Sequence, residues 1–128
     1  VFSSDLSNPV FYAQYAHARL CKLLETGADI GLDLTAVNIR ETAEINLLKH
    51  LQEFPTMIEG CAKTRDPYKV ATYIQKLAGL THAFYTECRV IDRDNIMLSK
   101  SRLALCKASQ IVMRNALNVL GVNAPEQM

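Results

Sequence analysis

Apolar residues that recur every three or four positions, between well-marked helix ends, constrain this 128-residue chain most strongly. The clearest run steps along one face of a helix through Val70, Ile74, Leu77, Thr81, Phe84 and Cys88. No β-branched alternating segment of convincing length occurs. The sequence therefore predicts an all-α helical bundle of about five helices. We expect them at about residues 9–26, 42–53, 55–64, 67–88 and 99–120.

Capping residues, prolines and glycines set these expected ends. Ser7-Asn8-Pro9 and Asp66-Pro67 each place a capping residue before a proline at the first helical position. Thr42 is the expected cap of the second helix, and Phe54-Pro55 should separate the second helix from the third. The first helix is expected to end at Gly27 and the last at Gly121.

Two connecting segments carry less information. Residues 28–40 fit either a packed connector or a short helical turn after Thr35, and we treat them as a loop. The DRDN turn at 92–95 precedes the last helix, where we expect Asp94 or Asn95 to cap.

The helical phase also predicts core positions. The first helix should bury Ala13, Ala16, Leu20, Leu23 and Leu24, with His17 and Cys21 near the edge of that stripe. The last helix should bury Leu105, Ala108, Val112, Ala116 and Leu120.

Composition narrows the class of protein without naming a partner. The chain is 49% hydrophobic and 21% charged, which is typical of one folded domain over residues 1–128. Its net charge of +1 indicates no particular ligand. No apolar run approaches the roughly 18 residues of a membrane helix. The four cysteines form no CxxC pair, which favours buried thiols in the cytoplasm over a metal site.

We find no catalytic motif in the sequence. The five glycines are scattered and cannot form a phosphate-binding loop. His17, His50 and His82 are solitary, with no HExxH pair for zinc, and are predicted to have structural roles. The chain is therefore predicted to bind a partner and to need no cofactor of its own.

The outward face of the first helix is the candidate binding surface, and it gathers Phe11, Tyr12, Tyr15, Arg19 and Lys22. Aromatic rings beside cations can stack unpaired bases and neutralise phosphate. The same residues could instead cover another helix. Tyr85 raises the same question, whereas Lys100, Lys107 and Arg114 are interpreted as a solvated stripe.

Several segments resemble one known family: NPVFYAQYAHAR at 8–19, FP at 54–55, LAGLTHAFYTECRV to IDRDN at 77–95, RLALCKASQIVMRNALNVLGV at 102–122 and the final APEQM. In this order they resemble the C-terminal anticodon-binding (DALR-type) domain of arginyl-tRNA synthetase, a class Ia aminoacyl-tRNA synthetase.

The resemblance implies an RNA partner and specific contacts. Tyr15, Arg19, Tyr85 and Met128 match family positions that meet the anticodon loop of arginine tRNA. Gln127 stands where many members have arginine. The resemblance also implies a Rossmann-type catalytic domain, absent here, that uses ATP with Mg. This chain alone should then be an inactive, monomeric fragment of a ligase. The alternative is a helical module for protein interaction or interdomain docking.

Overall fold

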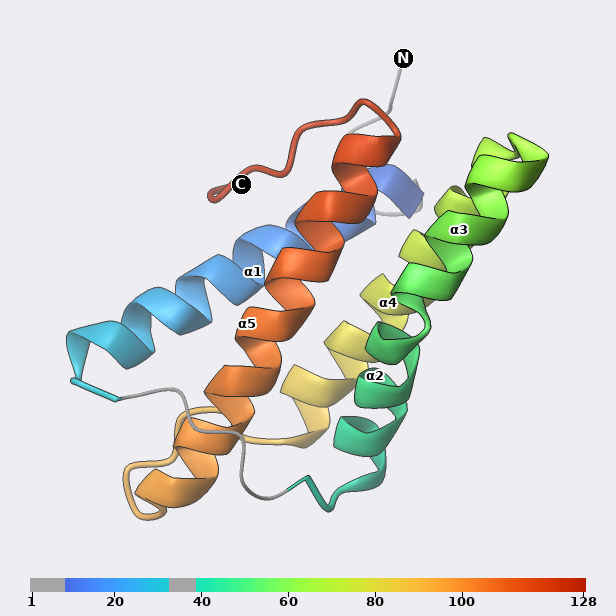
Figure 1. Ribbon diagram of the computed structural model, residues 1–128. Coiled ribbons are helices and arrows are strands. Elements are labelled where there is room, and N and C mark those ends of the chain that lie inside the picture. Colours follow the sequence, from blue (N-terminus) through green and yellow to red (C-terminus); the bar gives the residue numbers. More distant parts are fainter. Residues whose placement is uncertain (1–8, 33–38) are drawn as a thin grey trace.

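The computed structural model describes residues 9–32 and 39–128, and these residues form five helices and no strand (Figure 1). The helices are α1 (Pro9–Asp29), α2 (Thr42–Gln52), α3 (Phe54–Thr64), α4 (Pro67–Glu87) and α5 (Ile96–Val119). The all-α prediction is confirmed. The expected cap at Ser7-Asn8 and the alternative helical turn after Thr35 lie outside the described residues.

Helix α4 lies at the centre of the arrangement, because it contacts each of the other four helices. Helices α1 and α5 cross each other and both pack on α4, while α2 and α3 follow one another along it (Figure 1). After α5, residues 121–128 turn back toward α1. We call these residues the tail.

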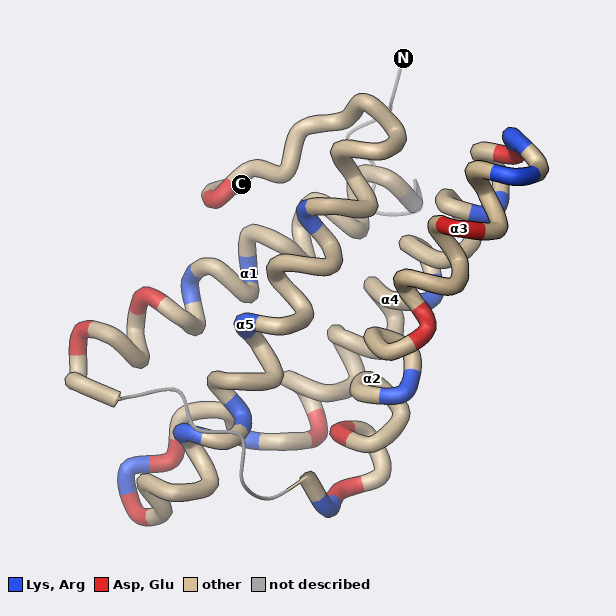
Figure 2. Tube along the Cα trace, viewed as in Figure 1, with Lys and Arg blue, Asp and Glu red and all other residues tan. Residues whose placement is uncertain are grey.

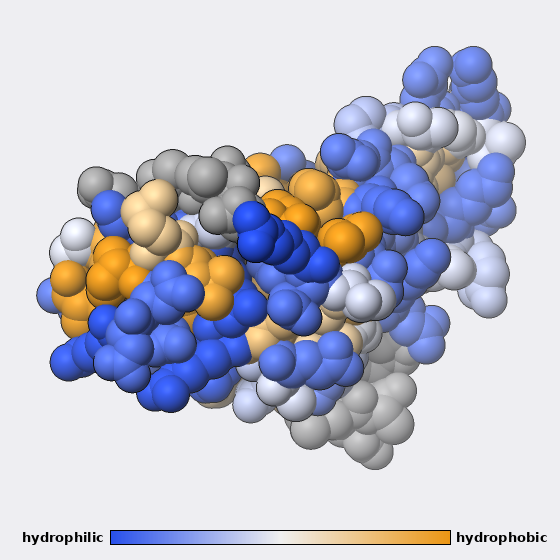
Figure 3. Space-filling view, turned by 90° about the horizontal axis from the view of Figure 1, so that it is seen from below, coloured by the Kyte–Doolittle hydropathy of each residue, from blue (hydrophilic) through white to orange (hydrophobic). Residues whose placement is uncertain are grey.

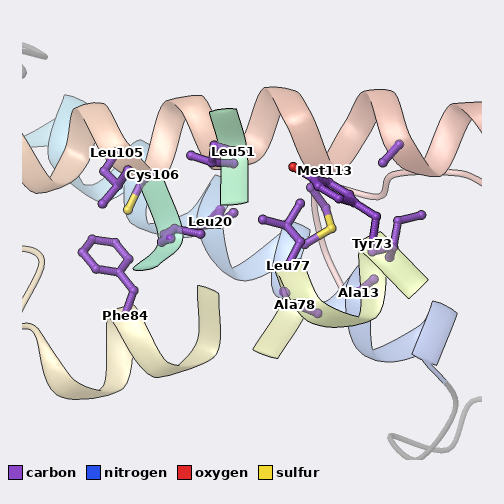
Figure 4. Packing of buried hydrophobic residues seen from close by; sticks show 14 of the residues in the cluster. Ala13, Leu20, Leu51, Tyr73, Leu77, Ala78, Phe84, Leu105, Cys106 and Met113 are labelled. Atoms are coloured by element: carbon purple, nitrogen blue, oxygen red, sulfur yellow. The ribbon is translucent and has the colours of Figure 1, made fainter. Parts of the chain in front are cut away.

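The core forms where α1, α2, α4 and α5 meet, and Figure 4 shows their side chains converging on one interior. Every residue predicted to face the core from α4 is buried, as are Ala13, Ala16 and Leu20 of α1. Leu23 and Leu24 are half-buried. The histidine predicted at the edge of the α1 stripe, His17, is also fully buried.

The prediction for α5 was wrong in part. Ala108 is exposed, and Val112 and Leu120 are only half-buried. Because α5 packs on α1, α4 and α2 together, its buried face is wider than one stripe and shifted in phase. Its buried apolar residues are Leu103, Leu105, Cys106, Met113, Ala116 and Leu117.

The starts of α4 and α5 have the expected kind of cap, although α5 begins at Ile96, three residues before the expected start at residue 99, because Asn95 caps it. The Asp66 carboxylate accepts a hydrogen bond from the Tyr68 N–H at 3.0 Å, and the Asn95 side chain accepts one from the Leu98 N–H at 3.2 Å. Thr42, however, is the first helical residue, and Glu41 takes the cap position. The buried Glu44 carboxylate accepts from the Glu41 N–H at 3.2 Å, which stabilises this start.

The break between α2 and α3 is confirmed, but it is a single residue, Glu53, with Phe54 already helical. Pro55 lacks the N–H that would continue the hydrogen-bonding of α2, so the chain bends here without forming a loop.

Gly27 does not end α1, contrary to the prediction. The helix continues to Asp29, and Gly31, with a positive φ of 77°, forms the turn that follows. Gly27 is buried, and a Cβ placed there would lie 2.6 Å from Leu103 Cδ1. The glycine therefore leaves room for the Leu103 side chain of α5. Gly121 does follow α5 as predicted, with φ 74°.

None of the helices in the described ranges combines the length and apolar character of a membrane span.

The face seen from below in Figure 3 is mostly hydrophilic, with hydrophobic residues gathered in separate areas. The exposed Ile96 and Met97, 41% and 54% accessible, begin α5.

Alanine substitution is expected to have opposite effects on stability at two glycines in helices. Gly79 of α4 is exposed with no atom within 4 Å of its Cβ position, so Gly79→Ala should stabilise the fold by about 0.5–1 kcal/mol. Gly27→Ala should destabilise it by about 1 kcal/mol, because overpacking against Leu103 outweighs the gain in helix propensity. Urea unfolding measures both changes, and a comparable stabilisation by the two variants would contradict this packing account.

Candidate nucleic-acid interface

A groove runs between α1 and the tail. Its volume is about 380 Å³, and it is lined by Tyr15, Ala18, Arg19, Lys22, Glu25, Glu126, Gln127 and Met128. Four residues predicted from the sequence, Tyr15, Arg19, Lys22 and Met128, are therefore brought together in one place.

Apolar surface remains open to solvent in this groove. The Tyr15 side chain is 42% exposed and Met128 is 54% exposed. The tyrosine lies on a rigid helix whose opposite face is buried in the core, so its ring has a fixed support. An aromatic ring and a thioether on two walls of one groove suit a flat, unpaired base.

Two side chains of α1 hold the tail in position. The Gln14 side chain donates from Nε2 to the Asn123 carbonyl at 2.8 Å, and His17 Nδ1 lies 2.8 Å from the Pro125 carbonyl oxygen. Burial lowers the pKa of His17 and is the largest effect. The hydrogen bond to the Pro125 carbonyl opposes it, and the smaller effects of Arg114, which lowers the pKa, and Glu126, which raises it, follow.

Tyr85 approaches the groove from α4 but does not line it. It is half-buried against the core, and the Arg19 guanidinium carbon lies 5.7 Å from the centre of its ring. This is a cation–π distance, so the Tyr85 ring orients the Arg19 side chain from the α4 side of the groove. Burial raises the pKa of Tyr85 to about 12, with smaller contributions from Tyr12 and Tyr15, while Arg19 opposes the rise. The phenol is therefore neutral near pH 7.

Tyr12 and Phe11 lie farther along α1 and outside the groove lining. Both are half-buried, and Tyr12 packs against the core. Burial raises the pKa of the Tyr12 hydroxyl. The structure thus separates the predicted face of α1 into a groove-lining part and a flanking part.

His82 joins these parts and was missed as a member of the surface. It is exposed, its Nδ1 and the Tyr85 hydroxyl share a hydrogen bond at 3.1 Å, and its ring lies edge-on to the Tyr85 ring at 5.2 Å. On its other side the Tyr12 ring lies 6.1 Å away. The sequence feature that could have identified His82 is its spacing, because it stands three residues before Tyr85 on the same helix face.

The groove carries nearly balanced charge. Arg19 and Lys22 face it together with the carboxylates of Glu25 and Glu126, two acidic residues that sequence reasoning also missed. Figure 2 shows basic and acidic positions interspersed along the helices, with no long run of one sign. Such a groove favours one base with a nearby phosphate over a long stretch of phosphate backbone.

The groups that could serve other chemistry are few in the described part of the chain. Within the described ranges, no three His, Cys, Asp or Glu residues gather in a metal-binding arrangement. Cys61, Cys88 and Cys106 are buried, as predicted, whereas Cys21 is half-buried. Burial raises the pKa of Cys106 to about 12, so its thiol is unreactive.

Comparison with known proteins agrees with this geometry. The family model described as "DALR anticodon binding domain" matches residues 13–128. The chain belongs to this family. It is 45% identical to the arginine–tRNA ligase of Bacillus subtilis over 130 aligned residues, which cover 98% of this chain and 23% of the ligase. The chain therefore spans about a quarter of the length of that relative.

Solved structures of arginyl-tRNA synthetases share the fold of this DALR domain. One from Campylobacter jejuni, described as putative, has a TM-score of 0.80 at 27% identity, over 98% of this chain and 28% of that one. The Thermus thermophilus enzyme has a TM-score of 0.72 at 26% identity, over 91% of this chain and 21% of that one.

The lowered pKa of His17 predicts a loss of stability on acidification. The imidazole of the unfolded chain takes up a proton near its ordinary pKa of 6.5, whereas the folded chain resists protonation. The contribution of neutral His17 to the free energy of unfolding is thus fully present above pH 6.5, and it is lost as the pH falls through the lowered pKa of His17 in the folded chain. Between about pH 7 and about pH 5, the free energy of unfolding should fall more steeply for the wild type than for His17→Leu. Parallel pH profiles would contradict the assignment.

Proposed function

We propose that this DALR domain binds the anticodon loop of arginine tRNA through the groove between α1 and the tail. It would do so as one part of an arginine–tRNA ligase. The observation that carries the proposal is the meeting of Tyr15, Arg19 and Met128 at a single open groove. Family membership and the 45% identity to a bacterial arginine–tRNA ligase support the same partner.

In this proposal the groove takes one base that has left the anticodon stack. The base lies between the Tyr15 ring and the Met128 thioether, and Arg19, oriented by Tyr85, neutralises a neighbouring phosphate. Lys22 adds a second cation one turn along α1. Tyr12, His82 and Phe11 flank this groove and would contact the adjoining nucleotides.

The genetic code makes a single base pocket sufficient for recognition. Every arginine codon has G at its second position, so every arginine anticodon has C at its centre, whereas the flanking bases vary. Stacking on an aromatic side chain is worth roughly 1–3 kcal/mol per base, or about 5- to 150-fold in affinity. Every base can stack, so stacking holds the central base in the groove without selecting it. Hydrogen bonds from the polar side chains that line the groove to the edge of the base would distinguish C from the other bases.

The rest of the proposed ligase supplies the chemistry. We propose that a catalytic domain on the same polypeptide activates arginine with ATP and Mg²⁺, and that this domain acts within a monomer. The groove described above has no nucleophile paired with a base, so its proposed contribution is the choice of tRNA.

Tyrosine substitutions test the groove directly. Tyr15→Ala should weaken binding of an arginine anticodon stem-loop by about 5- to 150-fold, because it removes the stacking ring. Deletion of Met128 should also weaken it, because one wall is lost. Tyr68→Ala is the matched control, since Tyr68 is 75% exposed but lies outside the groove lining. Fluorescence anisotropy with labelled RNA measures all three.

The same measurement separates RNA binding from protein docking on this face. Wild-type RNA affinity in both Tyr15→Ala and the Met128 deletion would overturn the site. If those folded variants instead lost binding to a separately produced catalytic domain, the groove would be an interdomain surface.

A further inference from the structure

His17 is a polar residue in an otherwise apolar stripe. It lies on α1 between Ala13, Ala16 and Leu20, all buried in the core, and it is itself fully buried. Burying an imidazole costs free energy unless its polar atoms find hydrogen-bond partners. The strong partner here is the Pro125 carbonyl at 2.8 Å, which belongs to the tail and not to the helical core.

The chemistry of this contact fixes the form of the imidazole. A carbonyl oxygen can only accept a hydrogen bond, so Nδ1 must carry the hydrogen and donate. The ring remains neutral near pH 7, because burial, the largest effect, lowers its pKa and outweighs the opposing hydrogen bond to the Pro125 carbonyl; Arg114 of α5 lowers the pKa and Glu126 raises it by smaller amounts. Because Nδ1 donates to Pro125, Nε2 is the ring atom left to accept, and it lies 4.0 Å from Cys21 Sγ, which itself accepts from the Gln110 side chain of α5 at 3.0 Å.

The position of the contact decides how far Met128 can move. Val122 makes the last backbone hydrogen bond to α5, to Leu117 at 3.0 Å. A six-residue segment beyond it could reach about 20 Å if free, whereas a three-residue segment beyond Pro125 reaches only about 10 Å. The fixed φ of Pro125 stiffens the segment further. Gln14, which holds Asn123, acts too early in the tail to replace this restraint.

We propose that His17 is a positioning residue that clamps the tail through Pro125, so that Met128 forms the second wall of the RNA-binding groove. The consequence for RNA rests on the proposed function. The clamp itself is a property of the protein without RNA.

Backbone order parameters of the free protein test the clamp. In the wild type the order parameters of the Glu126, Gln127 and Met128 amides should be about 0.85, and in His17→Leu they should fall below about 0.6. His17→Asn, whose amide Nδ2 can donate from nearly the same position, should restore part of the order. His50→Leu is the matched control, because His50 is also buried and bonded to a backbone carbonyl, that of Tyr73 at 3.0 Å. It should leave the tail ordered.

The wild type offers a second measurement in case His17→Leu does not fold. Long-range ¹H–¹⁵N correlation spectra should show the Nδ1–H tautomer of His17. An Nε2–H tautomer would overturn the clamp, as would an ordered tail in folded His17→Leu.

A double-mutant cycle with RNA distinguishes the clamp from the groove. If His17 acts through Met128, His17→Leu and deletion of Met128 should each weaken binding of the arginine stem-loop by a similar factor. The double variant should then be no weaker than the worse single variant. Additive losses would show that His17 acts elsewhere and would overturn the proposal. A loosened tail with unchanged RNA affinity would keep the clamp and refute the proposed groove.

Discussion

The close packing of α1 against α5 and α4 is the constraint on which the rest of the structure depends. Small residues contribute to it: Ala13 and Ala16 are buried in the core, and Gly27 leaves room for the Leu103 side chain of α5, whose Cδ1 would lie 2.6 Å from a Cβ at that position. Because the inner face of α1 is fixed in this way, its outer face has one orientation. Tyr15 and Arg19 therefore stand at a defined distance from Tyr85 on α4 and from the tail that follows α5.

In the proposed function, this packing gives different roles to different side chains. The core supplies rigidity, Tyr15 and Met128 supply exposed apolar surface, and Arg19 supplies charge held over the Tyr85 ring. Two carboxylates, those of Glu25 and Glu126, offset the two cations of the groove. Electrostatic attraction alone would then bind RNA weakly, so affinity must come mainly from stacking, and selectivity from the shape of the groove and from hydrogen bonds to the edge of the base.

The sequence predicted the parts of this account that depend on local rules. Periodicity of 3.6 residues placed Tyr15 and Arg19 on the outer face of α1, and capping chemistry located the start of α4 at Asp66. Asn95 was one of two expected caps for α5, but the apolar pattern placed the start of that helix three residues too late. Gly27 was misread because a glycine that ends a helix and a glycine that admits a neighbouring helix look alike in one sequence. Only the tertiary contact with α5 distinguishes the two roles.

Local sequence rules also could not predict contacts between segments that are distant in the chain. The bond between His17 and the Pro125 carbonyl joins positions 108 residues apart, and no periodic pattern links them. The resemblance to a family, and no spacing rule, suggested that Met128 belongs with Tyr15. His82 was visible in the sequence, but its place beside Tyr12 required the packing of α1 on α4.

Recognition of the central anticodon base is the central claim, and RNA substitution tests it most directly. Affinity of this chain should be measured for an arginine anticodon stem-loop and for the same stem-loop with the central C changed to U. The account predicts that the change weakens binding by at least about tenfold, because U presents an acceptor where C presents an amino donor and one good contact to a base edge is worth about 1–3 kcal/mol of discrimination. Equal affinities for the two RNAs would contradict it.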